Sequence, residues 1–203
     1  MRSEIVNRKL KMVLPIIAYG DPVLRKVGEN IEKDYPDLDN LIANMKDTMK
    51  NARGVGLAAP QIGKAIRLFL VDTSPFSQDD ELNEKEKDFL KEYKRVFINA
   101  EIIKEEGKLW AFNEGCLSIP NINEDVFREE TVTIEYFDEN FNKHTEVVKG
   151  LAARVIQHEY DHIEGILFTD KLSSLKRRLL KKKLENISKG KVEVEYRMKF
   201  PKK

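Results

Sequence analysis

The sequence has a single cysteine and no long apolar run, features that disulfide-rich and membrane-spanning proteins need. Its 203 residues include one cysteine, Cys116, which excludes an internal disulfide framework and fits a reducing cytoplasm. No apolar run approaches the ~18 residues that a membrane-spanning helix needs. The longest run near the N-terminus, residues 13–18, contains Pro15 and is too short for the core of a secretion signal. We therefore expect a soluble, cytoplasmic protein with no membrane segment.

Charge is nearly balanced over the whole chain but not along it. Residues 171–203 contain 13 Lys and Arg against three Glu, whereas residues 1–170 contain 23 basic and 32 acidic residues. An acidic body with a basic C-terminal segment suggests that this segment meets an anionic partner. From charge alone, a solvated basic helix face is the more economical interpretation.

The order of predicted elements favours an α+β protein. Periodic apolar residues predict three helices, over residues 37–52, 151–164 and 172–188. Strand patterns, including one hairpin, are found over residues 66–71, 95–98, 131–137 with 143–148, and 192–198. These elements lack the regular alternation of a parallel βαβ fold, so the α+β class is favoured.

Two predicted segments are rich in charge. Residues 77–94 contain mostly Asp, Glu and Lys, and we expect a solvated excursion between strands with a helix over 84–93. The helix over 172–188 combines a Lys/Arg face with an apolar stripe that includes Leu175 and Leu179.

The clearest chemistry lies in residues 158–162, His-Glu-Tyr-Asp-His, which hold two of the three histidines. Positions i and i+4 of a helix share a face, so both imidazoles can reach one metal ion. The rings also continue the apolar side of Leu151 and Val155, where buried polar groups need partners. Glu159 is placed to act on water beside a metal rather than to bind the metal itself. A metal site is therefore favoured over a helix with two surface histidines.

A catalytic site of this type needs a third protein ligand. The metzincin pattern would require a histidine where the chain has Phe168. His144, Glu185 and Cys116 remain open as candidates, although Glu185 lies in the Lys-rich helix and His144 at the edge of the hairpin. Cys116 is also compatible with a small buried hydrophobe, or with a nucleophile paired with histidine.

Residues 54–61, Gly-Val-Gly-Leu-Ala-Ala-Pro-Gln, formally match the dinucleotide-binding fingerprint. That fingerprint needs a strand before it and a helix after it. Here a predicted helix precedes it and a predicted strand follows it, so we reject a nicotinamide or flavin site. The glycines are better explained by close approach of a ligand or strand, or by a helix end at Gly54.

Three segments together resemble the peptide deformylase family: residues 54–61, residues 114–118 (Glu-Gly-Cys-Leu-Ser) and residues 158–162. They occur in the family's order, and the resemblance extends over about residues 13–189. It implies a single α+β domain, residues 13–203, in which antiparallel sheets pack around a central metal-binding helix. It also implies removal of the formyl group from the formyl-methionine of newly synthesised polypeptides.

The resemblance implies the ligands of the metal and the groups that act on the substrate. Cys116, His158 and His162 are the implied ligands of one Fe²⁺ per chain, for which Zn²⁺, Ni²⁺ or Co²⁺ can substitute. Glu159 is the expected general base, which later delivers the proton to the departing amine. The Gln61 amide and the Leu117 backbone N–H are the implied donors to the developing oxyanion.

Further residues are expected to bind the peptide or support the site. The peptide is expected to add as a strand to the backbone around Val55, Gly56 and Gly115. An apolar pocket for methionine is expected from Val55, Phe112, Leu151 and Val155, with the aliphatic stem of Arg154 at its rim. Asp161 is expected to be held by Arg128 beside the ligands.

The resemblance also bears on the two ends of the chain and on its partners. The helix over 172–188 resembles the C-terminal helix of the Gram-negative-like subgroup, which implies ribosome contact through ribosomal RNA. We expect a monomer. Residues 1–12 are expected to be an N-terminal extension, with Met1 and Met12 both open as the initiator. The excursion over 77–94 exceeds the family's common connection and has no assigned role.

Two alternatives are kept beside this hypothesis. One is a zinc peptidase that cuts internal peptide bonds. The other is a catalytically silent, ribosome-associated module with a structural metal, although Glu159 argues against a purely structural site because such a site needs no base.

Overall fold

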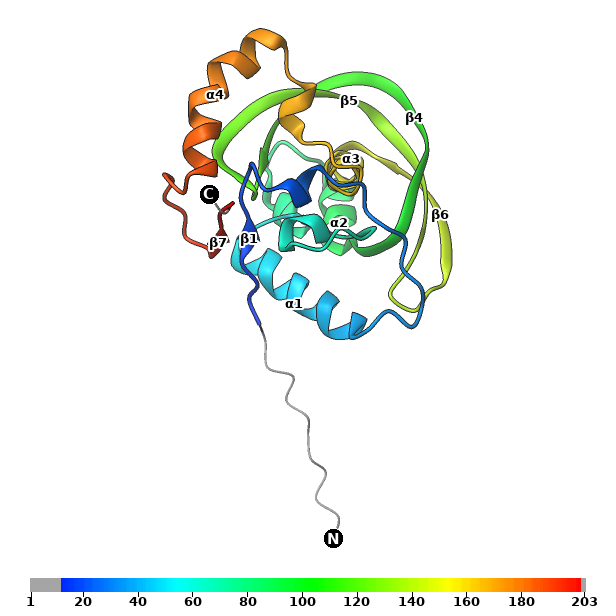
Figure 1. Cartoon of the computed structure of the whole chain (residues 1–203). Coiled ribbons are helices and arrows are strands. Elements are labelled where there is room, and N and C mark those ends of the chain that lie inside the picture. The colour runs from blue at the N-terminus through cyan, green and yellow to red at the C-terminus, as the bar shows by residue number, and fades with distance from the viewer. Residues whose placement is uncertain (1–11, 202–203) are drawn as a thin grey trace.

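The computed structural model describes residues 12–201, so the predicted extension 1–12 lies outside the described residues except for Met12. A five-stranded antiparallel sheet organises this part of the chain (Figure 1). Its strands, in order across the sheet, are β2 (Gly56–Ala58), β3 (Leu68–Asp72), β4 (Lys94–Cys116), β5 (Ile119–Phe137) and β6 (Lys143–Lys149). A separate two-stranded parallel sheet joins β1 (Ile16–Ile17) to β7 (Met198–Lys199).

Four α-helices accompany the sheets within the described residues: α1 (Leu38–Asn51), α2 (Glu84–Glu92), α3 (Gly150–Ile163) and α4 (Ser174–Ser188). Short 3-10 helices are η1 (Pro22–Arg25), η2 (Ala59–Ile62), η3 (Ser74–Gln78) and η4 (Phe168–Lys171). The long strands β4 and β5 arch around α3, which lies near the centre of the molecule (Figure 1). Ten of the 14 residues of α3 are buried, so this helix is packed on most of its surface.

The single α+β domain confirms the predicted fold class. The helices over 37–52, 151–164 and 172–188 correspond to α1, α3 and α4 within two residues at each end. The predicted hairpin is confirmed as the pairing of β5 with β6, from Thr131 opposite Lys149 to Phe137 opposite Lys143. No helix among residues 12–201 is both long and apolar enough to cross a membrane.

Strand lengths differ most from the prediction. β4 continues 18 residues beyond the predicted end at Ile98, and β5 begins 12 residues before Thr131. In the added part of β4 most residues are exposed, including the apolar Ile103 and Leu109, so the sequence lacks the regular apolar-polar alternation that marks a half-buried strand. Pairing between β4 and β5 holds these arms together. The predicted strand over 192–198 is wrong except at Met198, because residues 192–197 do not pair as a strand.

The charged excursion is better anchored than predicted. A helix over 84–93 is confirmed as α2, and its N-terminus is capped by Asn83, whose side chain accepts from the N–H of Glu86. Leu90 and Tyr93, however, are buried in the core beside α3. The segment is therefore docked on the domain. On α4, Leu175 and Leu179 are exposed (55% and 71%), contrary to the predicted apolar stripe, because only one narrow face of the helix meets the body.

Candidate active site

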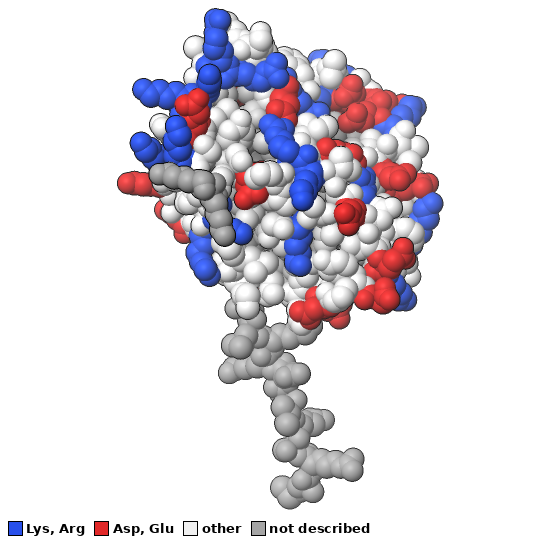
Figure 2. Space-filling model, in the orientation of Figure 1, with Lys and Arg blue, Asp and Glu red and all other residues white. Residues whose placement is uncertain are grey.

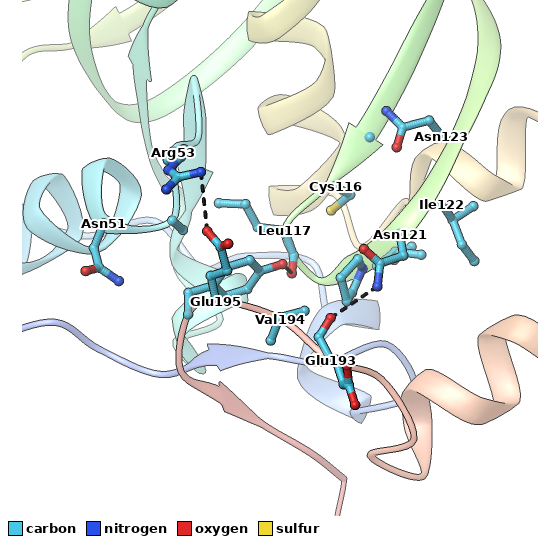
Figure 3. A pocket seen from close by; sticks show the side chains of 15 residues that line it. Asn51, Arg53, Cys116, Leu117, Asn121, Ile122, Asn123, Glu193, Val194 and Glu195 are labelled. Atoms are coloured by element: carbon cyan, nitrogen blue, oxygen red, sulfur yellow. Dashed lines mark hydrogen bonds and ion pairs between the residues drawn. The ribbon is translucent and has the colours of Figure 1, made fainter.

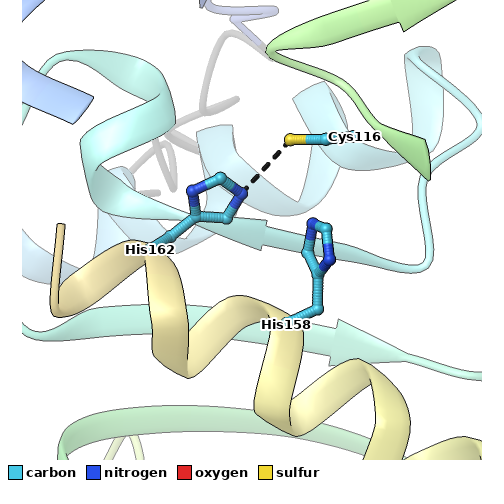
Figure 4. A group of neighbouring side chains, drawn as sticks. All are labelled: Cys116, His158 and His162. Carbon is cyan, nitrogen blue, oxygen red and sulfur yellow. Dashed lines mark hydrogen bonds between the residues drawn. The ribbon is translucent and has the colours of Figure 1, made fainter. Parts of the chain in front are cut away.

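Three potential metal ligands meet beside α3 (Figure 4). His158 and His162 lie one turn apart on this helix, and Cys116 is the last residue of β4. One ligand atom from each lies within 4.8 Å of the others, and Cys116 Sγ is 3.3 Å from His162 Nε2. Of the three candidates for a third ligand, Cys116 is the one that joins the histidines. His144 lies on β6 instead, where its Nε2 is 2.9 Å from Asp138 Oδ2.

The surroundings of the two histidines shift their pKa values in opposite directions. Burial lowers the pKa of His158, but hydrogen bonds with Cys116 and Glu114 outweigh it and raise the pKa well above its ordinary value. Burial and the nearby charge of His158 lower the pKa of His162. The donor set, one thiol sulfur and two imidazoles, fits a transition metal. Cys116, His158 and His162 could therefore hold one.

Glu114 orients His158, and sequence analysis did not assign it a role. Its Oε2 lies 2.9 Å from His158 Nδ1, so the other ring nitrogen is the one left for a metal. Burial alone would favour the neutral carboxyl, but hydrogen bonds from Arg128 and His158 hold the pKa of Glu114 well below its usual range. Its place directly before Gly115 and Cys116, in a segment already singled out, was the available signal.

Two arginines surround Glu114. Arg128 donates to both of its carboxylate oxygens, at 2.7 and 2.9 Å, and through Nη1 to Asp161 Oδ2 at 2.7 Å, which confirms the predicted contact of Arg128 with Asp161. Arg154 does not lie at a pocket rim as predicted. Its side chain is 2% exposed and donates to Glu114 Oε1 at 3.0 Å and to the Trp110 carbonyl at 2.7 Å. The buried negative charge of Glu114 draws this guanidinium inward, since a buried ion needs a partner.

Glu159 lies against Gly56 and next to the three ligands. It is 4% exposed, and its Oε2 is buried with no hydrogen-bond partner among the described residues. A Cβ on Gly56 would lie 2.6 Å from Glu159 Cδ and 2.7 Å from its Cγ, so the missing side chain makes room for this carboxylate. Burial raises the pKa of Glu159 to about 7. A carboxyl that titrates near neutral pH can both take up and release a proton there.

Gln61 and Leu117 lie on the other side of Cys116. The Ala58 N–H donates to Gln61 Oε1 at 2.8 Å, which directs Nε2 to Cys116 Sγ (3.6 Å) and Ser118 Oγ (3.4 Å). Leu117 follows Cys116 in the turn between β4 and β5, so its backbone N–H is also next to the thiol. Two such donors can stabilise negative charge that develops near the metal ligands.

The side chains predicted to bind methionine gather near the N-terminal half of α3. Val55, Leu151 and Val155 belong to one hydrophobic cluster. Phe112 meets Phe76 of η3 edge to face, with ring centroids 6.3 Å apart, and Phe76 packs against the same cluster. Phe76 was not identified from the sequence, because it stands alone between Pro75 and a polar stretch.

Two hollows adjoin this region. A cavity of about 980 Å³ lies beside Phe112 and Leu151, with Leu82 and Phe89 of the excursion among its lining residues. A groove of about 500 Å³ passes Gly115 and Cys116 and is bounded on its far side by residues 193–196 (Figure 3).

β2 contains Gly56 and is an edge strand of the sheet, so an extended peptide can pair with it beside the ligands.

Comparison with known proteins identifies the family. The family model described as polypeptide deformylase matches residues 13–178. A peptide deformylase of Christiangramia forsetii is 67% identical over 190 residues, covering 94% of this chain and 97% of the relative. One of Flavobacterium johnsoniae is 66% identical over 189 residues, covering 93% and 96%.

Solved structures agree with the sequence relatives. The crystal structure of a peptide deformylase from Legionella pneumophila superposes with a TM-score of 0.74 at 37% identity, covering 88% of this chain and 97% of that one. A peptide deformylase from Thermotoga maritima gives a TM-score of 0.69 at 34% identity, covering 79% and 98%. The chain therefore belongs to the polypeptide deformylase family, and its activity is the hydrolytic removal of the formyl group from the amino terminus of nascent polypeptides.

Proposed function

We propose that Cys116, His158 and His162 bind the catalytic metal of this deformylase and that Glu159 is its general base. The observation that carries this assignment is the buried, unpartnered carboxylate of Glu159 beside three converging metal donors. When bound, the metal supplies Lewis acidity toward water and the formyl carbonyl. Glu159 accepts a proton from the attacking water and delivers it to the departing amine nitrogen.

Gln61 and Leu117 are the proposed oxyanion donors. The Gln61 carboxamide is held by the Ala58 N–H, so its NH₂ group is already turned toward Cys116 before substrate arrives. Preorganised donors of this kind stabilise charge that develops on the formyl oxygen, and loss of one costs about 10²–10³ in rate. Arg128 and Asp161 support the site by fixing Glu114 and, through it, the ring of His158.

The proposed substrate contacts combine an edge strand with an apolar pocket. The peptide backbone pairs with the chain around Val55, Gly56 and Gly115. The methionine side chain occupies the apolar region of Val55, Phe112, Leu151 and Val155. Val55, Leu151 and Val155 share one hydrophobic cluster, and Phe112 joins it through Phe76, which supports this arrangement.

Formate release tests these roles. Protein purified without oxygen is assayed with a short N-formyl-methionyl peptide, beside Glu159→Ala and the control Glu185→Ala, which removes an exposed carboxylate of α4. We expect wild type and Glu185→Ala to release formate, and Glu159→Ala to release almost none while it keeps one metal per chain. Loss of metal together with activity in Glu159→Ala would contradict the role as a base. No release by metal-loaded wild type would instead favour the silent module.

Fe²⁺ is the proposed native metal, as the family resemblance implies. Two imidazoles and a thiolate also accept Zn²⁺, Ni²⁺ and Co²⁺, so these are proposed substitutes. Elemental analysis of protein prepared without oxygen is expected to find about one iron per chain. Full activity in a preparation that contains zinc and no iron would refute iron as the required ion.

We propose that α4 contacts the ribosome, because its exposed surface combines positive charge with apolar side chains. Lys and Arg side chains gather over α4 at the upper left of Figure 2. Leu175 and Leu179 are exposed on the same helix, which gives an apolar contact among cations. Co-sedimentation with ribosomes should weaken in Leu175→Ser/Leu179→Ser and at high salt. The same binding with residues 171–203 removed would refute the proposal.

We also propose that the protein is cytoplasmic and monomeric. The single free thiol, Cys116, suits a reducing compartment. Light scattering coupled to size-exclusion chromatography is expected to give one chain's mass, 23.6 kDa. A concentration-independent mass of twice that value would refute the monomer.

A further inference from the structure

The hairpin turn next to Cys116 lacks the residues that such turns favour. β4 ends at Cys116 and β5 begins at Ile119, so Leu117 and Ser118 form a two-residue turn. Turns of this length favour Gly, Asn or Asp, because one or both positions take a positive φ. Neither Leu117 nor Ser118 has a positive φ. The turn is therefore not one of the types whose twist matches that of the two strands, and contacts from other segments help to hold it.

Three such contacts reach the turn from distant parts of the chain. The Tyr19 N–H donates to the Ser118 carbonyl at 2.8 Å. The Gln61 side chain donates to Ser118 Oγ at 3.4 Å. The Tyr196 hydroxyl donates to the Leu117 carbonyl at 2.8 Å. Of these three contacts, the one from Tyr196 engages Leu117 itself, and it comes from beyond α4.

The segment that carries Tyr196 is itself anchored on both sides. Directly after it, the Ile16 N–H donates to the Arg197 carbonyl at 2.8 Å, and β7 then pairs with β1. Before it, the Asn121 side chain donates to the Glu193 carbonyl at 3.2 Å (Figure 3). The Tyr196 ring is half-buried against the core cluster that includes α1. The phenol therefore approaches the turn from a fixed backbone.

We propose that Tyr196 is a positioning residue for deformylation, which holds Leu117 so that its N–H stays directed at the reacting formyl oxygen. This inference rests on the proposed oxyanion role of Leu117. The carbonyl that accepts from Tyr196 and the N–H that would donate to substrate flank the same Cα. Fixing the carbonyl limits rotation about that residue and keeps the N–H preorganised. Because the stabilised charge exists only in the transition state, its loss lowers kcat and leaves KM nearly unchanged.

The test compares two variants that each remove one tyrosine hydroxyl hydrogen bond. Tyr196→Phe removes the bond to Leu117 and keeps the ring. Tyr93→Phe is the matched control, because its hydroxyl donates to Glu146 Oε2 at 2.9 Å on a different part of the molecule. We expect kcat of Tyr196→Phe to fall about three- to tenfold with KM within about twofold. Metal content and Tm should match those of Tyr93→Phe, whose kcat stays at the wild-type value.

A second measurement does not depend on activity. Amide hydrogen exchange of the peptide containing Leu117 and Ser118 should accelerate in Tyr196→Phe and remain at the wild-type rate in Tyr93→Phe. Unchanged kcat in Tyr196→Phe would overturn the proposal, as would a rise in KM alone or a fall accompanied by metal loss. If wild type itself releases no formate, the proposed function fails. In that case the exchange measurement still shows whether Tyr196 holds the turn.

Discussion

Replacing Gly56 with alanine should impair the proposed base while leaving the proposed metal ligands in place. Gly56 does not have a positive φ, so alanine fits its backbone, and the effect is steric. The new Cβ would lie 2.6 Å from Glu159 Cδ and 2.7 Å from Cγ, whereas ordinary contacts begin at 3.4 Å. The carboxylate must therefore move by roughly 1 Å, and a misplacement of this size in a catalytic group costs about 10²-fold in rate.

A hundredfold loss corresponds to about 2.7 kcal/mol of transition-state stabilisation. Formate release should show it as a lower kcat, with metal content unchanged because the three atoms nearest to the added methyl group all belong to Glu159 and not to the proposed metal ligands. Since Cγ as well as the carboxylate is crowded, rotation of the outermost torsion alone cannot relieve the contact. The loss should therefore persist at saturating substrate and across neutral pH.

The double variant Gly56→Ala/Glu159→Ala provides the control. If Gly56→Ala acts only through Glu159, it should have little further effect in the Glu159→Ala background, since effects of groups that act as a unit are not additive. Wild-type kcat in Gly56→Ala would refute the steric reasoning. An equal loss in both backgrounds would show that the methyl group obstructs the peptide rather than the base.

Three further outcomes follow from the geometry. Arg128→Met removes the cation shared by Glu114 and Asp161, which leaves Arg154 beside the first and Lys171 beside the second, and should cost up to about 3–5 kcal/mol. Calorimetry should show this as a Tm about 10 °C lower, against almost no change in the exposed-pair control Arg53→Met. Burial favours neutral Asp170, but its bonds with Arg25 and a backbone N–H lower its pKa below 3.8. Stability from Asp170 should therefore be present above pH 3.8 and lost as pH falls through the folded pKa, so thermal melts of Asp170→Asn and wild type should converge in acid. Phe76→Ala should raise KM for a formyl-methionyl peptide about three- to tenfold with kcat little changed, and an unchanged KM would exclude it from the methionine pocket.

Much of the fold, and the shared helix face of His158 and His162, could be predicted because the signals were local. The 3.6-residue period located α1, α3 and α4, and the spacing of His158 and His162 placed both rings on one side of α3. The family resemblance then added Cys116, which residue spacing had left open among three candidates. The predicted order around residues 54–61, a helix before them and a strand after them, agrees with the structure, where α1 precedes this segment and β3 follows η2.

What could not be predicted depends on contacts between distant segments. Glu114 and Arg154 lie 40 residues apart in the sequence. No local pattern around either residue indicates that the two side chains are buried together as an ion pair. The long arms of β4 and β5 hide their strand character, because most residues of the β4 arm are exposed while its backbone pairs with β5. Inward side chains of the β5 arm, such as Val126 and Arg128, are buried only in the folded chain. The 77–94 excursion is mostly polar, and only the folded chain shows Leu90 and Tyr93 buried beside α3.

The sequence by itself determined the functional groups available to this protein: a carboxylate, two imidazoles and a thiol in segments that resemble one family. Tertiary structure alone decided their environment. It buried Glu159 against Gly56, which raises the pKa of the carboxyl toward neutrality, and it placed Glu114 on His158. It also carried Tyr196 back to Leu117 across 79 residues of chain. Desolvation and hydrogen bonds between distant residues arise only when the chain is folded. Local sequence patterns therefore could not predict these environments.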